Sequence, residues 1–230
     1  MVSFLKNEKG AMRIFPAPHT QNIQELTTLF KELDPFVPGY HIDIMDGEFV
    51  PATMGSIQLT NQLDTLTPRV LWVHLMVKNP LAYIKQLRLK SESIISFHYE
   101  SIQPAEREEI IGLIEQNLWR ASLAINPETP IGSVLQLTHG VSHLTLMAVH
   151  PGAAGQEFLP ETWEKIEHLI AYRAAQEFSF EIAVDGGTTT DILSDLKEYG
   201  VNAVATHSAL FKNDTPLLNL QKLSELFTLE

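Results

Sequence analysis

The stretch VLWVHLM, residues 70–76, decides the fold class together with PLAYIKQLRLK, residues 80–90, and SIISFH, residues 93–98. The first and third are short apolar runs of the kind that form strands buried on both faces, and the middle one has the apolar spacing of a helix. A strand, a helix and a second strand in this order are typical of a parallel βαβ unit. We therefore predict an α/β fold.

The same unit recurs along the whole chain. The strand candidates are residues 13–17, 40–45, 70–76, 93–98, 121–126, 143–150, 180–185 and 202–208. The clearest helical patterns are residues 22–34, 80–90, 105–117, 160–177, 190–200 and 216–227, and residues 48–68 are expected to hold a loop and a short helix. Eight strands in 230 residues give about 29 residues per unit, close to the ~30 of a βαβ unit. This predicts a single (β/α)8 TIM barrel domain over residues 1–230, with residues 1–11 as an N-terminal extension. An open doubly wound sheet is the alternative.

Composition restricts the kind of chemistry. The formal net charge of −12 is spread without a basic stripe, which argues against nucleic acid and an anionic membrane surface as partners. The chain has no cysteine, so a metal would have imidazole or carboxylate ligands. No apolar run approaches the ~20 residues of a membrane helix, and the N-terminus does not have the pattern of a signal peptide. We expect a cytoplasmic protein that acts on a small molecule.

Polar side chains interrupt the apolar strands near their carboxyl ends. In a barrel, residues of one parity point inward, and catalytic groups collect at the carboxyl ends of the strands. Four side chains from three strands share the inward parity: His41, Asp43, His74 and Asp185. Each of them alone has a structural explanation, but four together favour a metal site. Imidazole and carboxylate suit one divalent ion, and zinc, iron(II), manganese and cobalt all remain open.

Segments of small residues, two of them rich in glycine, follow the last three predicted strands. They are HPGAAGQEF at residues 150–158, DGGTTTD at residues 185–191, and HSALF at residues 207–211. Backbone amides of small-residue loops and helix N-termini bind phosphate, and barrels commonly place such a site in their late loops. Ordinary turns explain each segment equally well, and their clustering is what indicates a phosphate site.

These motifs together resemble the ribulose-phosphate 3-epimerase family. The similarity runs from RIFPAP to ATHSALF through HIDIMDGEFVP, VHLMV, FHYES, NPETPI, MAVHPGAAGQEFLPE and VDGG. The resemblance implies a barrel of the ribulose-phosphate-binding type and a divalent metal held by His41, Asp43, His74 and Asp185. Family members are commonly dimers or larger, so a homo-oligomer is possible.

The resemblance also implies a reaction. The family is one of isomerases that invert the carbinol carbon next to a ketone by 1,1-proton transfer through a metal-bound enediolate. Asp43 and Asp185 would be its two catalytic acids, and Met45, Met76 and Met147 would surround the metal as an apolar sleeve unless they are only core. The sugar phosphate expected first is D-ribulose 5-phosphate, converted to D-xylulose 5-phosphate, and D-allulose 6-phosphate is an alternative substrate.

The substrate-binding positions depart from the family pattern. The resemblance assigns them to Ala17, Gly152, Ala153, Ala154, Gly155, Gly186, Gly187, His207 and Ser208. Ala17 replaces a serine, Ala153 replaces an aromatic residue, and His207 replaces a glycine, so its imidazole would either crowd a phosphate or donate to it. A catalytically weak phosphosugar-binding paralogue is therefore a second hypothesis.

Two further expectations follow from the same strands. A decarboxylase of the same barrel type would need an Asp-x-Lys-x-x-Asp arrangement, and the second strand contains no lysine. Among the other histidines, His98 is expected to make a structural hydrogen bond, and His19 is expected to have no catalytic role.

Overall fold

Nine strands form one curled sheet in the computed structural model, which describes residues 12–228. The strands are β1 (Arg13–Pro16), β2 (Gly39–Asp46), β3 (Thr53–Met54), β4 (Val70–Met76), β5 (Ile94–His98), β6 (Arg120–Ile125), β7 (His143–Met147), β8 (Glu181–Asp185) and β9 (Ala203–Thr206). Their order is β1-β9-β8-β7-β6-β5-β4-β2-β3, and every pair is parallel except β2 with β3. Because β1 and β2 also lie side by side, the eight parallel strands enclose an interior. The predicted (β/α)8 barrel is confirmed, and the open sheet is excluded.

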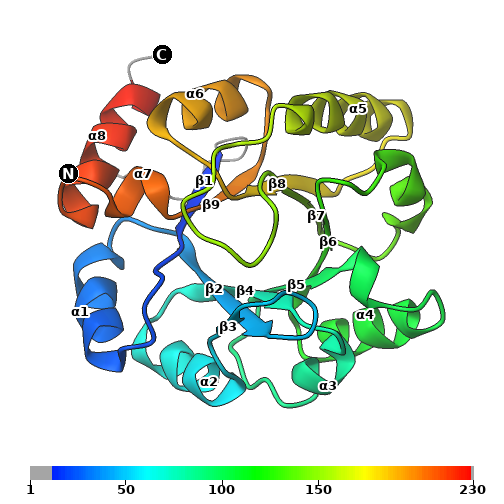
Figure 1. Cartoon of the computed structure of the whole chain (residues 1–230), viewed down its shortest axis with the longest axis horizontal. Helices are drawn as coiled ribbons and strands as arrows, with labels where there is room; N and C mark the ends of the chain where they lie inside the picture. Colours follow the sequence, from blue (N-terminus) through cyan, green and yellow to red (C-terminus); the bar gives the residue numbers. More distant parts are fainter. Residues whose placement is uncertain (1–11, 229–230) are drawn as a thin grey trace.

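Helices surround this sheet on its outer side (Figure 1). They are α1 (Ile23–Leu33), α2 (Ile57–Leu66), α3 (Pro80–Ile84), α4 (Glu106–Gln116), α5 (Glu161–Ala175), α6 (Thr190–Glu198), α7 (Ser208–Phe211) and α8 (Pro216–Thr228). Strand residues of outward parity, such as Val73 and Leu75, are fully buried in the main hydrophobic cluster between sheet and helices. Most of the hydrophobic burial that stabilises the fold lies in this layer.

A second, smaller cluster fills the inside of the barrel. The rings of Phe15 and Trp72 meet edge to face with their centroids 5.3 Å apart, and Ala183 and Ala203 pack in the same cluster. The indole Nε1 of Trp72 donates to Oγ of Ser96 at 2.7 Å, so its one polar group is satisfied. The interior is therefore a packed core, and a cavity opens above it at the carboxyl ends of the strands.

Helix α3 is shorter than its sequence pattern predicts. The pattern covers residues 80–90, but the helix ends at Ile84. The side-chain amide of Asn61 on α2 donates to the carbonyl of Gln86 at 3.1 Å and accepts from the backbone N–H of Arg88 at 2.8 Å. These backbone groups are therefore committed to a neighbouring helix, and the next helical turn cannot form.

Residues 48–68 hold the expected loop and short helix, α2, and add the strand β3, which pairs antiparallel with the end of β2. The predicted strand 143–150 ends at Met147 because the chain turns away there. The expected extension at residues 1–11 lies outside the described residues.

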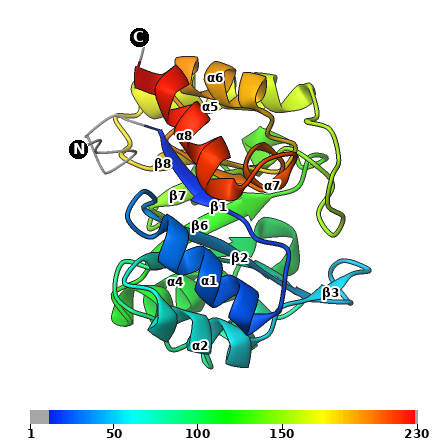
Figure 2. The same ribbon diagram turned by 90° about the vertical axis from the view of Figure 1, so that its left-hand side faces the viewer.

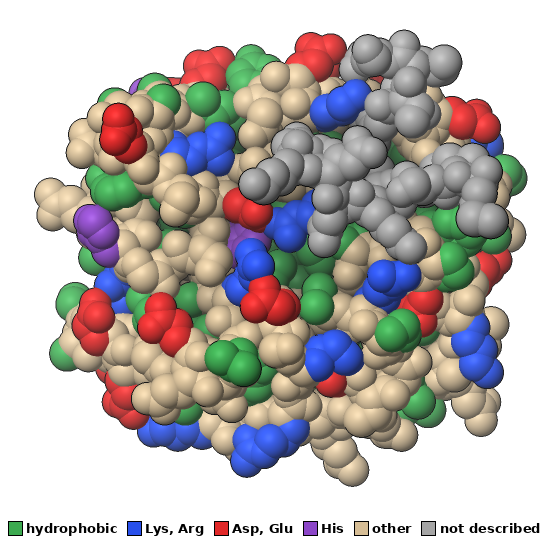
Figure 3. All heavy atoms as spheres, turned by 180° about the vertical axis from the view of Figure 1, so that it is seen from behind, with side chains coloured by type: hydrophobic (Ala, Val, Ile, Leu, Met, Phe, Trp, Pro, Cys, Tyr) green, Lys and Arg blue, Asp and Glu red, His purple; other side chains and the backbone are tan. Residues whose placement is uncertain are grey.

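Among residues 12–228, none of the helices combines the length and the apolar composition that a membrane crossing requires. On the face opposite to that of Figure 1, acidic and basic side chains alternate without a stripe of one sign (Figure 3).

Candidate active site

A cavity of about 470 Å³ opens at the carboxyl ends of the barrel strands. Figure 2 shows β3 and the segment 150–158 projecting from the same side of the barrel, and residues of both line the cavity. The amino-terminal ends of the strands lie on the opposite side. The cavity thus occupies the place where a barrel of this class carries its chemistry.

The four residues of inward parity meet at the bottom of this cavity. Nε2 of His41 lies 3.1 Å from Oδ1 of Asp43 and 3.3 Å from Oδ2 of Asp185. Nδ1 of His74 lies 2.9 Å from Oδ2 of Asp185 and 3.5 Å from Oδ1 of Asp43. One ligand atom from each residue lies within 4.8 Å of all the others, and this is the metal-compatible cluster found among the described residues.

The spacing of these atoms fits a single cation. Donors at about 2.0–2.2 Å from one tetrahedral ion would be about 3.4 Å apart. The four measured separations, from 2.9 to 3.5 Å, agree with that expectation. Two imidazoles and two carboxylates also match the ligand preference of zinc and its neighbours in the first transition row. This set of residues is therefore able to hold a divalent metal ion.

The pKa values of the site are set by close contacts between two acidic side chains and two imidazoles. Burial opposes charge on all four groups, but the pairing outweighs it. The carboxylates of Asp185 and Asp43 raise the pKa of His41 to about 10, and they also raise the pKa of His74. In turn, the imidazoles hold the pKa values of both acids well below their usual range. Without a metal, the site therefore favours ionised carboxylates on both acids and a protonated imidazole on His41.

His74 makes a further contact through its other ring nitrogen. Its Nε2 lies 2.9 Å from Nε2 of His98 at the end of β5, and Nδ1 of His98 lies 3.3 Å from Oε2 of Glu100. His74 and His98 are both fully buried. Burial lowers the pKa of His98. Burial would raise the pKa of Glu100, but the hydrogen bonds that its carboxylate accepts, first of all the one from His98, lower this pKa. His98 is therefore neutral and Glu100 ionised, and the expected hydrogen bond of His98 is found.

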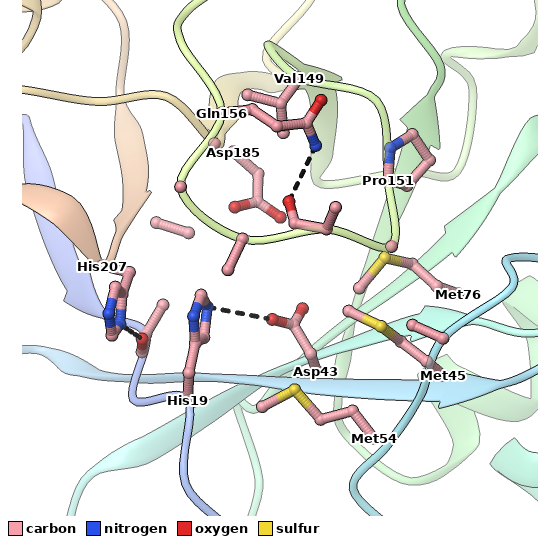
Figure 4. Close-up of a pocket in the computed structure, with 18 of the residues that line it drawn as sticks. His19, Asp43, Met45, Met54, Met76, Val149, Pro151, Gln156, Asp185 and His207 are labelled. Carbon is pink, nitrogen blue, oxygen red and sulfur yellow. Dashed lines mark hydrogen bonds and ion pairs between the residues drawn. The ribbon is translucent and has the colours of Figure 1, made fainter.

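The walls of the cavity contain all the other residues assigned from the sequence. Those on the wall are Ala17, Met45, Met76, Met147, Gly152, Ala153, Ala154, Gly155, Gly186, Gly187, His207 and Ser208, together with the two acids. In Figure 4, Asp185 reaches the cavity from above and Asp43 from below, and the side chains of Met45 and Met76 lie beside Asp43. Met54 on β3 also lines the cavity, and the sequence analysis did not assign it.

Glycines allow two loops to approach each other at the rim. Gly187 has φ +66°, and a Cβ there would lie 2.6 Å from the backbone nitrogen of Phe158. Gly152 has φ +101°, and a Cβ there would lie 2.9 Å from Cβ of Val50. The side-chain amide of Gln156 donates to the carbonyls of His150 and Ala153 and holds the segment 150–155 in shape. Only glycine fits such close contacts at positive φ.

Two stacked imidazoles, backed by a phenyl ring, form one wall of the cavity. The imidazoles of His19 and His207 lie face to face, with centroids 3.9 Å apart and planes 1° apart, and Phe211 stacks on the other side of His207. Nδ1 of His207 donates to the carbonyl of Ala17 at 2.9 Å, and Nε2 of His19 lies 4.0 Å from Oδ2 of Asp43 (Figure 4). His19, which is expected from the sequence to have no catalytic role, therefore lies on the cavity wall, and the sequence analysis did not place it there. The available signal was its place directly after the first strand, at the carboxyl end of the barrel.

Comparison with known proteins gives a consistent result. The model of the ribulose-phosphate 3 epimerase family matches residues 11–211. Ribulose-phosphate 3-epimerase from Buchnera aphidicola is 32% identical over 184 residues, which are 80% of each chain. The proteins of the same name from Schizosaccharomyces pombe and Escherichia coli are 31% and 30% identical, over 76% and 74% of this chain and 76% of each relative.

Solved structures show the same fold at lower identity. A mutant tryptophan synthase alpha-subunit from Pyrococcus furiosus has a TM-score of 0.65 at 14% identity and covers 95% of this chain and 98% of its own. Orotidine 5'-monophosphate decarboxylase from Sulfolobus solfataricus has a TM-score of 0.60 at 11% identity and covers 94% and 97%. At such identities the likeness concerns the barrel alone.

Proposed function

We propose that this chain, which belongs to the ribulose-phosphate 3-epimerase family, is a metal-dependent 3-epimerase of a ketose phosphate. The leading reaction is D-ribulose 5-phosphate to D-xylulose 5-phosphate. One observation carries the proposal beyond family membership: Asp43 on β2 and Asp185 on β8 bring two carboxylates to the same His41 nitrogen, at 3.1 and 3.3 Å, on the floor of one cavity.

The chemistry of the reaction requires two acids. Inversion at C3 begins with removal of the proton next to the carbonyl, which leaves an enediolate, and ends with delivery of a proton to the opposite face. Asp43 and Asp185 reach the cavity from different strands and from opposite sides of the view in Figure 4, which supports giving one proton transfer to each. One acid must be ionised and the other protonated at the start. Two carboxylates that share one cation titrate as a unit, so the starting proton belongs to the pair.

His41, Asp43, His74 and Asp185 would hold one divalent cation, for which zinc, iron(II), manganese and cobalt are all candidates. When bound, such an ion supplies Lewis-acid stabilisation of the negative charge that develops on the sugar oxygens. The residues themselves position the sugar and move the proton. Met45, Met76 and Met147 line the same cavity as the two acids and would form an apolar sleeve around the bound ion.

The phosphate end of the substrate would lie against the glycine loops. Gly186 and Gly187 follow β8 with positive φ, and the segment 152–155 lines the same cavity. His207 is fixed here by its hydrogen bond to Ala17 and its two ring contacts. Its Nε2 makes no hydrogen bond among the described residues and would donate to the phosphate in the protonated form.

Two alternatives rest on the same departures from the family pattern. Ala17 and His207, which line the cavity, replace the serine and the glycine of the family pattern. This difference in the substrate-binding wall is the reason to test D-allulose 6-phosphate, a longer sugar, as a substrate. They also motivate the second hypothesis, a paralogue that binds a phosphosugar and turns it over poorly. A cytoplasmic location and a homo-oligomeric assembly stay predictions.

The deciding experiment follows the proton at C3. The full chain is incubated in heavy water with D-ribulose 5-phosphate or D-allulose 6-phosphate, with each of the four metal ions and with a chelator, and NMR records exchange at C3. Metal-dependent exchange with formation of the 3-epimer is the expected result. Binding of a phosphosugar without exchange would favour the paralogue, and exchange that a chelator leaves unchanged would contradict the metal-dependent mechanism.

A further inference from the structure

A chain of buried polar groups leads away from His74 to the outside of the barrel. At its inner end, Nδ1 of His74 faces Asp43 and Asp185. On the other side of the ring, Nε2 of His74 lies 2.9 Å from Nε2 of His98. The chain ends where Nδ1 of His98 contacts Oε2 of Glu100. The ring planes of His74 and His98 are 11° apart while their centroids are 5.0 Å apart. With the nitrogens so close, the rings meet edge to edge nearly in one plane, which is good hydrogen-bond geometry.

We propose that His98 and Glu100 are positioning residues that hold the Nδ1 lone pair of His74 toward the metal site. The inference rests on the proposed function, because it needs a cation between His74 and the two acids. It concerns residues that neither touch the sugar nor bind the metal. Their effect would be transmitted through His74 alone.

The direction of each hydrogen bond follows from the far end of the chain. The carboxylate of Glu100 only accepts, so the proton between it and His98 belongs to Nδ1 of His98. With its proton on Nδ1, His98 offers the lone pair of Nε2 to His74 at 2.9 Å, so the one proton between the two imidazoles belongs to Nε2 of His74. The remaining nitrogen of His74, Nδ1, is left to a cation. The charge of Glu100 thus selects the tautomer of His74 through an intervening ring.

Glu100 is itself held in place. Its Oε1 accepts from the backbone N–H of Asn126 at 2.8 Å and from the hydroxyl of Thr129. The ammonium of Lys165 on α5 binds the carbonyls of Asn126, Pro127 and Thr129 and so fixes this loop. The outer end of the chain is therefore rigid, which a positioning role requires.

His41 provides an internal contrast. Its Nδ1 is buried and makes no hydrogen bond among the described residues, so the protein does not select its tautomer in this way. Of the two imidazoles in the cluster, only His74 is connected through its other ring nitrogen to a carboxylate, that of Glu100. We therefore expect His74 to be the ligand whose affinity for the metal is tuned from outside the cluster.

The test compares two Glu→Gln variants in the full chain. Glu100→Gln removes the charge behind His98, and Glu181→Gln is the matched control because Glu181 pairs with another buried histidine, His143, at 2.9 Å at the other end of the barrel. Each variant is titrated with Co²⁺, followed by its absorption spectrum, and with Zn²⁺ in competition with a chelator. Circular dichroism checks the fold of both.

Glu100→Gln is expected to weaken metal binding by about 10–100-fold, while Glu181→Gln stays at the affinity of the unmodified chain. Glu100→Asp keeps the charge and should lose less. A second measurement does not depend on variants: imidazole ¹⁵N shifts of the zinc-loaded chain should show the proton on Nδ1 in His98 and on Nε2 in His74.

The outcomes separate this inference from the proposed function. If the unmodified chain binds metal and exchanges the C3 proton but Glu100→Gln binds metal equally well, or if His98 carries its proton on Nε2, the positioning role is overturned and the epimerase proposal stands. If the unmodified chain binds neither Co²⁺ nor Zn²⁺, the metal centre fails and the positioning role fails with it.

Discussion

Nδ1 of His74 lies 2.9 Å from Oδ2 of Asp185, although 111 positions separate the two residues in the chain. Their strands, β4 and β8, are not neighbours in the sheet. The contact exists because the sheet curls on itself and brings its distant strands across a common interior. Closure of the barrel is therefore what assembles the candidate site, and variants of the ligands test its chemistry directly.

The first prediction concerns the two acids. Asp43→Asn and Asp185→Asn keep the size of the side chain but remove its ability to take or give a proton. We expect each to lower the rate of epimerisation by about 10²–10⁴-fold, the usual size of a general acid–base contribution. Coupled assays of the 3-epimer measure the rate, and metal content is measured in parallel.

The control for this pair is Asp214→Asn. Asp214 forms an exposed ion pair with Lys222, and its loss should leave the rate unchanged. A variant that retains its metal and loses exchange at C3 would show that the carboxylate moves the proton as well as binding the ion. Unmodified rates in either Asp43→Asn or Asp185→Asn would contradict the assignment.

A second prediction follows from the raised pKa values of the imidazoles. In the metal-free chain the neighbouring carboxylates raise the pKa of His41 to about 10, so its imidazole carries a proton that a cation must displace, and they raise the pKa of His74 in the same direction. Metal binding should therefore release protons, and affinity should rise with pH from 6 toward the pKa of His41. Titrations with Co²⁺ at several pH values, and calorimetry in buffers of different ionisation enthalpy, measure both effects. An affinity that does not change between pH 6 and 9 would argue against protonated ligands.

The strand residues of this site could be predicted because their placement follows simple periodicity. Alternation along a strand put His41 and Asp43 on one face, and the common edge of parallel strands brought His74 and Asp185 to the same end. Neither step needs knowledge of side-chain conformation. The general location of the glycine loops followed in the same way.

The features that were missed depend on contacts between distant loops. The stack of His19 on His207 joins the first and last loops of the barrel, and no periodicity in the sequence relates them. The early end of α3 depends on the side chain of Asn61, which lies on another helix. Similarly, the link from His98 to His74 requires particular ring orientations in the folded protein. Sequence patterns specify which face a residue occupies, but not which partner its side chain meets.

A third prediction tests the role of His207 at the phosphate end. His207→Gly removes the imidazole and its stacking contacts with His19 and Phe211. If the imidazole donates to the phosphate, the variant loses a hydrogen bond to a charged group, about 1.5–3 kcal/mol. KM for the phosphorylated ketose should then rise by about 10–100-fold with a smaller change in kcat, measured by steady-state kinetics.

The opposite result has a clear meaning as well. If the imidazole crowds the phosphate, His207→Gly should lower KM, and the donor role assigned to it would be wrong. His168→Ala on the exposed face of α5 is the control for loss of a histidine and should leave KM unchanged.

A fourth prediction tests the glycine loops through a backbone position. Gly187→Ala places a Cβ 2.6 Å from the backbone of Phe158 at φ +66°, where a side chain also costs about 1–2 kcal/mol. The segment 150–158 must move to relieve the contact. We expect KM for the sugar phosphate to rise by at least about 10-fold, or 1.4 kcal/mol of binding. Steady-state kinetics and a Co²⁺ titration measure substrate and metal binding separately.

Gly132→Ala is the matched control for Gly187→Ala, because a Cβ at Gly132 would meet no atom within 4 Å. It should leave both KM and metal affinity as they are in the unmodified chain. Since Gly187 lies at the rim and the four ligands lie on the floor, Gly187→Ala should also bind Co²⁺ normally. An unchanged KM in Gly187→Ala would show that the sugar phosphate does not depend on the approach of these two loops, and the phosphate end of the substrate would then have to lie elsewhere in the cavity.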